Sequence, residues 1–266
     1  MKVFISADIE GVTTSCRWEE TDSGHGSYHL HAEQMTKEVL AACEGAIAAG
    51  ADEIWVRDGH GGGNNIDPTR LPKEVTLVRG WSNCPDFMVE GINDSFDAAM
   101  FIGYHSAAGR CGNPMSHTMS GRHTGIIING RRASEFMIYS MAAARHGVPT
   151  VLLTGDRMLC EDYRDLHPAL FTVPVKDGIG GAAFCRSVAA TIPEIRAKSE
   201  QSLRQNLGAA KITLPDAFEV EVHYKEHIQA EKVSHFPGVK KISDNIVSFY
   251  RDDFYEVLRT LLWIIY

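Results

Sequence analysis

Apolar and polar residues alternate along the chain in a pattern that predicts strands separated by helices. Residues 29–49 carry apolar side chains at helical spacing, and the run ends at Gly50. A second helix is predicted over residues 135–146, where Ser134 can cap the first turn. Short apolar runs typical of buried strands lie at residues 3–7, 54–56, 75–78, 98–102 and 150–153. Strands separated by helices pair in parallel, so we expect an α/β fold with a mostly parallel sheet and helices on both faces.

The end of the chain has a different pattern. Residues 218–222 alternate apolar with acidic side chains, and residues 252–264 have the spacing of an amphipathic helix. A hairpin is also predicted earlier, over residues 123–133, around an Asn-Gly turn. We therefore expect two domains. These are a metal-binding catalytic α/β domain, residues 1–207, and a small α+β unit, residues 208–266.

Acidic and histidine side chains follow most of the predicted strands. In an open α/β sheet, ligands bind beyond the carboxyl ends of the strands, and parallel strands share that edge. Carboxylates and imidazoles without thiolates suit zinc, manganese or cobalt, and a bridging carboxylate is what a two-metal site needs. A loop and a helix start add His117 and Glu135. The strand-end residues are Asp8, Glu10, Asp58, His60, His105 and Asp156.

Each of these residues also has a purely structural interpretation. Asp8 or Asp58 can cap a turn, and a single buried histidine is more often hydrogen-bonded than metal-bound. Glu135 can complement the dipole of its helix. The occurrence of such groups at several strand ends at once nevertheless favours a functional site.

Two further patterns could indicate binding sites but have simpler interpretations. The cluster of His25, His29 and His31 flanks a helix start and is better interpreted as a solvated or substrate-facing loop. Residues 178–183 match a dinucleotide-binding glycine pattern, but no acidic residue follows at the end of a next strand. No cofactor other than metal is therefore expected.

Composition excludes several classes of protein. The net charge is -8 and no run of lysine or arginine occurs, which argues against nucleic acid as a partner. The 12 histidines hint at metal or acid–base chemistry. The six cysteines are scattered without a C-x-x-C pair, as in a reducing cytosol. The first ten residues are unlike a signal peptide, and the apolar run at residues 261–266 is too short for a membrane span. We expect a cytoplasmic protein that does not bind membranes.

A set of short motifs, in order and spacing, resembles the zinc D-aminopeptidases of the bacterial dipeptide-transport operon type. The resemblance covers most of the chain through about residue 160. The loop at residues 12–28 and the C-terminal unit depart from the family pattern, so both are expected to shape the substrate pocket. The motifs are Asp8-x-Glu10-Gly11, Asp58-x-His60, Met88-Val89-Glu90-Gly91, Gly103-Tyr104-His105, Met115-Ser116-His117-x-Met119 and the helix start at Glu135.

The resemblance implies the site and the assembly. It implies two zinc ions per chain, bridged by Asp8, and a catalytic His117, described for the family as a nucleophile. Chemistry also allows His117 to act as general base and acid, which we favour because a metal pair already supplies a nucleophile. The family further implies a ten-subunit double ring around a chamber that admits short peptides. The implied zinc ligands are Asp8, Glu10, His60, His105 and Glu135.

We therefore expect a dizinc aminopeptidase that hydrolyses short peptides or amino-acid amides with D-residues at the amino end. Two alternatives stay open. One is another dinuclear-metal amidohydrolase or phosphoesterase that uses the same edge of the sheet, although no phosphate-binding loop is visible. The other is a peptide-binding ring protein without turnover.

Overall fold

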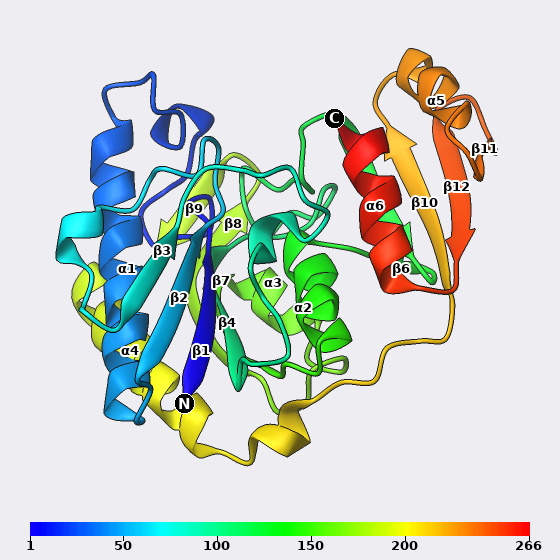
Figure 1. Ribbon diagram of the computed structural model, residues 1–266. Helices are drawn as coiled ribbons and strands as arrows, with labels where there is room; N and C mark the ends of the chain where they lie inside the picture. The colour runs from blue at the N-terminus through cyan, green and yellow to red at the C-terminus, as the bar shows by residue number, and fades with distance from the viewer.

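The computed structural model describes residues 1–266 and contains two sheets (Figure 1). The larger sheet has seven strands in the order β3-β2-β1-β4-β7-β8-β9. All neighbouring strands pair in parallel except β9, which is antiparallel to β8. The strands are β1 (Lys2–Ala7), β2 (Glu53–Asp58), β3 (Val75–Val78), β4 (Ala98–Tyr104), β7 (Thr150–Asp156), β8 (Phe171–Ile179) and β9 (Ala182–Cys185).

Helices cover both faces of this sheet. On one face lie α1 (Tyr28–Ala48) and α4 (Val188–Arg204), whose apolar side chains pack with Val3 and Ile5 of β1. On the other lies α2 (Glu135–Arg145), which packs with Phe4 of the same strand. The short α3 (Arg157–Asp162) follows β7 on that side (Figure 1). Successive residues of β1 thus point into two different cores, as expected for a strand that is buried on both faces.

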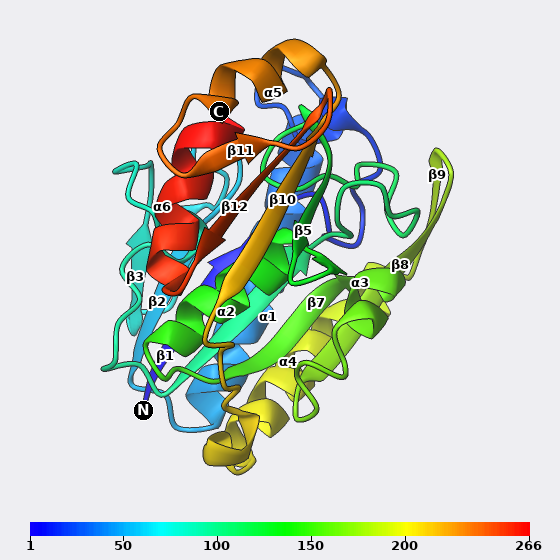
Figure 2. The same ribbon diagram turned by 90° about the vertical axis from the view of Figure 1, so that its right-hand side faces the viewer.

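A second, antiparallel sheet lies beyond α2 (Figure 2). Its strand order is β11-β12-β10-β5-β6, so a hairpin from the middle of the chain pairs with strands from the end. The apolar face of α6 packs with this sheet and with α2 in one continuous core. The elements are β5 (His123–Ile128), β6 (Arg131–Arg132), β10 (Phe218–Tyr224), α5 (His227–Ser234), β11 (Val239–Lys241), β12 (Ile246–Arg251) and α6 (Phe254–Ile265). The domain boundary at residue 207 stays a prediction.

The α/β fold expected from the sequence is confirmed. The five predicted strands of the large sheet occur where the patterns indicate them, and so do the helices predicted over residues 29–49 and 135–146. The Ser134 side chain accepts a hydrogen bond from the Met137 amide, as an N-cap residue should. Residues 178–183 comprise the end of β8, a turn at Gly180 and Gly181, and the start of β9, so the glycine pattern there has a structural role. None of the helices combines the length and apolar character that a membrane crossing requires.

Candidate metal centre and active site

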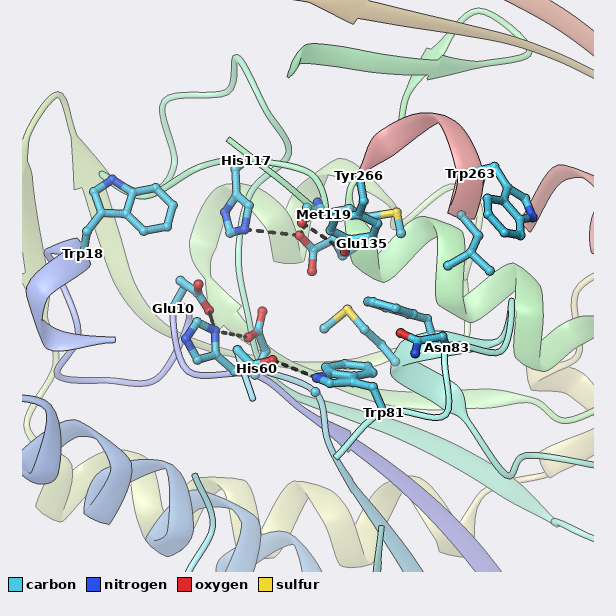
Figure 3. A pocket seen from close by; sticks show the side chains of 16 residues that line it. Glu10, Trp18, His60, Trp81, Asn83, His117, Met119, Glu135, Trp263 and Tyr266 are labelled. Carbon is cyan, nitrogen blue, oxygen red and sulfur yellow. Dashed lines mark hydrogen bonds and ion pairs between the residues drawn. The ribbon is translucent and has the colours of Figure 1, made fainter. Parts of the chain in front are cut away.

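A cavity of about 910 Å³ lies beyond the carboxyl ends of the parallel strands. Its charged side chains come from the residues that follow β1 and from the start of α2, and histidines from other loops complete that end. Aromatic and other apolar side chains line the opposite end (Figure 3). Sheet topology therefore places the side chains predicted at the strand ends around one space.

The loop after β1 carries Asp8 and Glu10, and it packs directly against the end of β4. The Gly11 amide donates a hydrogen bond to the Gly103 carbonyl at 2.8 Å. A Cβ atom at Gly11 would lie 1.8 Å from the Tyr104 carbonyl oxygen. Glycine is therefore required in the Asp-x-Glu-Gly motif, because two backbones meet there without space for a side chain.

Four side chains gather around the carboxylate of Asp8: His60, His105, Glu10 and Glu135. One of its oxygens lies 3.4 Å from His60 Nδ1, and the other lies 3.3 Å from His105 Nε2. His60 Nδ1 also lies 2.9 Å from Glu10 Oε2, and His105 Nε2 lies 3.7 Å from Glu135 Oε1. Asp8 thus stands between two histidine–glutamate pairs with an oxygen toward each. That is the position a bridging carboxylate would occupy between two metal ions.

The outer nitrogen of each histidine is held by a backbone carbonyl. His60 Nε2 lies 2.9 Å from the Thr21 oxygen, and His105 Nδ1 lies 3.0 Å from the Ser106 oxygen. A carbonyl oxygen only accepts, so the outer nitrogen carries the hydrogen and the inner nitrogen is available to a metal. This orienting bond is typical of histidine ligands in metal sites.

His117 joins the same cluster from the loop before β5. Its Nδ1 donates to the Met115 carbonyl at 2.9 Å, and its Nε2 lies 3.5 Å from Glu135 Oε1. Its ring stacks on His105 at 4.3 Å, and Trp18 makes an edge contact with it at 5.2 Å. These contacts fix the ring with Nε2 facing the cavity.

The electrostatics of the cluster follow from its buried carboxylates. Burial acts to lower the pKa of His105, but the neighbouring Asp8 and Glu135 carboxylates raise it to about 10. Burial likewise opposes the charged form of His60, yet Glu10 and Asp8 hold its pKa well above the usual range. Burial raises the pKa of Glu135 despite the nearby histidines. The buried carboxylates therefore favour positive charge within the cluster, which imidazole protons or divalent cations can supply.

The donor set fits zinc. Asp8 Oδ2, Glu10 Oε2 and His105 Nε2 are buried and have no partner in hydrogen-bonding geometry. Buried polar atoms are rarely left without a partner, so these three atoms are available to bind a cation. Candidate ligand atoms of Asp8, Glu10 and His105 lie within 4.8 Å of one another, as do those of His105, His117 and Glu135. Imidazole and carboxylate donors without thiolate are a normal zinc environment.

Two candidates at the strand ends have supporting roles instead. Asp58 accepts hydrogen bonds from the Asn65 and Ile66 amides, and the Asn65 side chain in turn donates to the His60 carbonyl. Asp156 caps α3 and accepts from the Ser106 amide at 2.7 Å. Neither carboxylate lines the cavity. Each holds the loop that carries a histidine of the cluster.

A buried lysine on β8 was not predicted by the sequence patterns. Lys176 Nζ donates to the carbonyl oxygens of Glu10 at 2.7 Å and Ser15 at 2.5 Å. Asn113 Nδ2 also donates to the Glu10 carbonyl, at 3.0 Å. Burial lowers the pKa of Lys176. The loop that carries Glu10 is thus held in place by hydrogen bonds from the buried Lys176 ammonium group and the Asn113 amide.

The N-terminal histidine cluster stays outside the site. His25 pairs with Asp22 at 3.8 Å, and His31 contacts Thr14 and Glu20, at 3.0 and 3.8 Å. None of the three histidines lines the cavity. The loop at residues 12–28 nevertheless shapes the site, as expected, because Trp18 and the Thr21 carbonyl belong to it. The C-terminal unit contributes as well, through Leu262, Trp263 and Tyr266.

Comparison with known proteins gives one consistent result. A family model described as D-aminopeptidase, Peptidase M55, matches residues 1–263. A D-aminopeptidase of Bacillus subtilis (strain 168) is 30% identical over 264 residues, which are 98% of this chain and 96% of that protein. A solved structure, the Zn-dependent D-aminopeptidase DppA from Bacillus subtilis, a self-compartmentalizing protease, matches with a TM-score of 0.92 at 28% identity. The match covers 100% of this chain and 97% of that chain.

Proposed function

The chain belongs to the Peptidase M55 family of D-aminopeptidases and is a zinc-dependent peptidase, and we propose that two zinc ions in the cavity serve its reaction. One observation supports this proposal most directly. Asp8 presents one carboxylate oxygen to His60 beside Glu10 and the other to His105 beside Glu135. Two adjacent sets of ligands that share a carboxylate are the arrangement of a dinuclear hydrolase.

The ligands divide between two positions. His60 and Glu10 would hold one ion, His105 and Glu135 would hold the other, and Asp8 would bridge them. Zinc bound there supplies Lewis-acid stabilisation of the negative charge that develops on the carbonyl oxygen during hydrolysis. Lys176 and Asn113 keep the Glu10 loop in place, and backbone carbonyls keep the imidazoles oriented.

His117 is proposed to move the protons. Its Nδ1 hydrogen is committed to the Met115 carbonyl, so Nε2 carries the lone pair that faces the cavity. Nε2 can take a proton from an attacking water and then give it to the departing amine. The stacking contact with His105 and the edge contact with Trp18 hold Nε2 in place for both transfers.

We also propose that the substrates are short peptides with a D-residue at the amino end, and that the chains assemble as a ten-subunit double ring. The support for assembly is that the similar solved structure is described as a self-compartmentalizing protease. We further propose that the protein works in the cytoplasm, which is compatible with its six cysteines, all of them free thiols.

The first test is hydrolysis of matched D- and L-aminoacyl amides by zinc-loaded protein, followed by removal of metal with a chelator. We expect faster release of ammonia from the D-series, loss of turnover in chelator, and recovery when zinc is restored. Unchanged turnover by metal-free protein would contradict the role of zinc. Hydrolysis of the L-series alone would contradict the D preference and leave the metal chemistry intact.

A further inference from the structure

The cavity contains a second feature, an aromatic wall that we define as Trp81, Phe87 and Tyr266. The Trp81 and Phe87 rings stack with centroids 4.3 Å apart and an interplanar angle of 22°. The Phe87 and Tyr266 rings follow at 5.5 Å and 32°. In Figure 3, Trp81 lies to the right of the group formed by Glu10, His60 and His117. The three rings form one continuous apolar surface beside the proposed zinc ligands Asp8, Glu10, His60, His105 and Glu135. We call this group of ligands the metal cluster.

The buried Arg57 side chain supports this wall. The Arg57 guanidinium lies 3.9 Å from the Trp81 ring centroid, on the face that Phe87 leaves free. Arg57 also donates to the Phe87 carbonyl at 3.3 Å and to the Val78 carbonyl at 3.4 Å. Trp81 is therefore fixed between a cation and a second ring, which favours a surface already organised before a ligand binds.

Both ends of the wall are joined to the metal cluster. Trp81 Nε1 donates to the carbonyl of Gly61, the residue after His60, at 2.7 Å. The Tyr266 hydroxyl donates to the Met119 carbonyl at 3.3 Å, and the Met119 amide donates to Glu135 Oε1 at 2.6 Å. A group that lies on the wall is thus held at a defined position relative to the cluster.

The three side chains of the wall line the cavity and are uncharged. Tyr266 is 49% exposed, and Trp263 at the outer edge is 70% exposed. The carboxylates that line the cavity all belong to the metal cluster, and Asn83 is the one amide side chain among the aromatic and aliphatic groups of this end. Exposed apolar surface inside a cavity marks a place for an apolar ligand.

From these observations we infer that the aromatic wall binds the side chain of the amino-terminal residue of the substrate, and that this side chain is large and apolar. The inference rests on the proposed function, because it places the scissile carbonyl at the metal cluster. The α-carbon of the amino-terminal residue is bonded to that carbonyl. Its side chain must therefore occupy space next to the cluster, and the wall begins there at both Gly61 and Met119.

Amino-acid amides test this inference because they carry one side chain only. We expect kcat/KM for D-phenylalanine amide and D-leucine amide to exceed that for D-alanine amide by about tenfold or more. Tyr266→Ala should reduce this ratio by about fivefold, because the wall loses a ring. Tyr266→Phe keeps the ring and should keep the ratio. Tyr250→Ala is the matched control, since Tyr250 is 62% exposed on β12 and does not line the cavity.

Binding of amino alcohols to the zinc-loaded protein, measured by calorimetry, separates this inference from the proposed function. D-Phenylalaninol should bind about tenfold more tightly than D-alaninol, and Tyr266→Ala should weaken only the former. Preferential binding of D-phenylalaninol without hydrolysis of any amide would support the wall and contradict the peptidase assignment. Equal rates and equal binding for the large and small side chains would overturn the inference. The inference would also be overturned if kcat/KM depended only on the second residue of D-alanyl dipeptides. It would be overturned as well if Tyr266→Ala reduced kcat/KM equally for amides with large and small side chains.

Discussion

The two ends of the cavity are built from different parts of the fold. At the metal cluster, Asp8, His105 and Glu135 are almost completely buried, and each follows a strand of the parallel sheet or begins α2. At the aromatic wall, Trp81 and Phe87 belong to the loops between β3 and β4, and Tyr266 follows α6. These rings are partly exposed.

This difference separates the reaction from the selectivity. Groups that perform chemistry need positions set by rigid elements, and the sheet edge supplies them. Groups that select a side chain can lie on loops and on the last element of the chain, which can change without moving the sheet. We therefore expect changes at the cluster to abolish metal binding and changes at the wall to alter substrate preference only.

The largest effect is expected from Gly11→Ala at the metal end. The added methyl group would meet the Tyr104 carbonyl, so β1 and β4 would have to separate where Asp8 and Glu10 begin. We expect a loss of about 3 kcal/mol in the free energy of unfolding, together with loss of zinc. Urea unfolding and metal analysis of the purified variant measure both.

Gly121→Ala is the matched control for this substitution, because a Cβ there has nothing within 4 Å. Tyr266→Ala at the wall should retain zinc and stability. The comparison of the two ends fails if Gly11→Ala binds zinc normally, or if Tyr266→Ala loses zinc to the same extent.

A smaller effect concerns the layer that supports the metal end. His167 is buried against Phe136, and its Nε2 lies 3.1 Å from the Ser140 hydroxyl on α2, the helix that carries Glu135. Burial lowers the pKa of His167 to about 4 from 6.5. The stability that a neutral His167 contributes is therefore present above pH 6.5 and lost as the pH falls toward 4. At about pH 5 the loss is roughly 2 kcal/mol.

Urea midpoints at neutral and mildly acidic pH test this contribution. The wild-type chain should lose stability between the two conditions, and His167→Gln should lose about 2 kcal/mol less. His235→Gln is the control, because His235 is exposed. An equal loss in His167→Gln and wild type would show that other groups cause the pH dependence.

Local patterns were sufficient for the core of the fold but not for its edges. The strands β1, β2, β3, β4 and β7 are short apolar runs bounded by polar residues, and α1 and α2 have clear helical periodicity. In contrast, β8 contains a proline and the buried Lys176, and α4 contains Pro193, so neither has a regular pattern. The pairing of β5 with β10 joins segments far apart in the chain, and no local pattern reports it.

The site shows the same division. Strand-end position indicated the carboxylates and histidines of the cluster, because parallel strands end at one edge whatever else the fold contains. The same rule applied to β3 would have indicated Trp81, which follows that strand closely. Tyr266 could not be found in this way, since its place depends on how α6 packs against α2 and the second sheet.

The most direct test of the catalytic account concerns His117. We assign proton transfer to this residue, but the geometry also allows it to be a metal ligand together with His105 and Glu135. The decisive measurement is zinc content per chain, determined together with D-aminoacyl amide turnover, for wild type and His117→Ala. The account predicts two zinc ions per chain in both proteins and loss of turnover in the variant. Loss of zinc from His117→Ala would contradict it and make His117 a ligand.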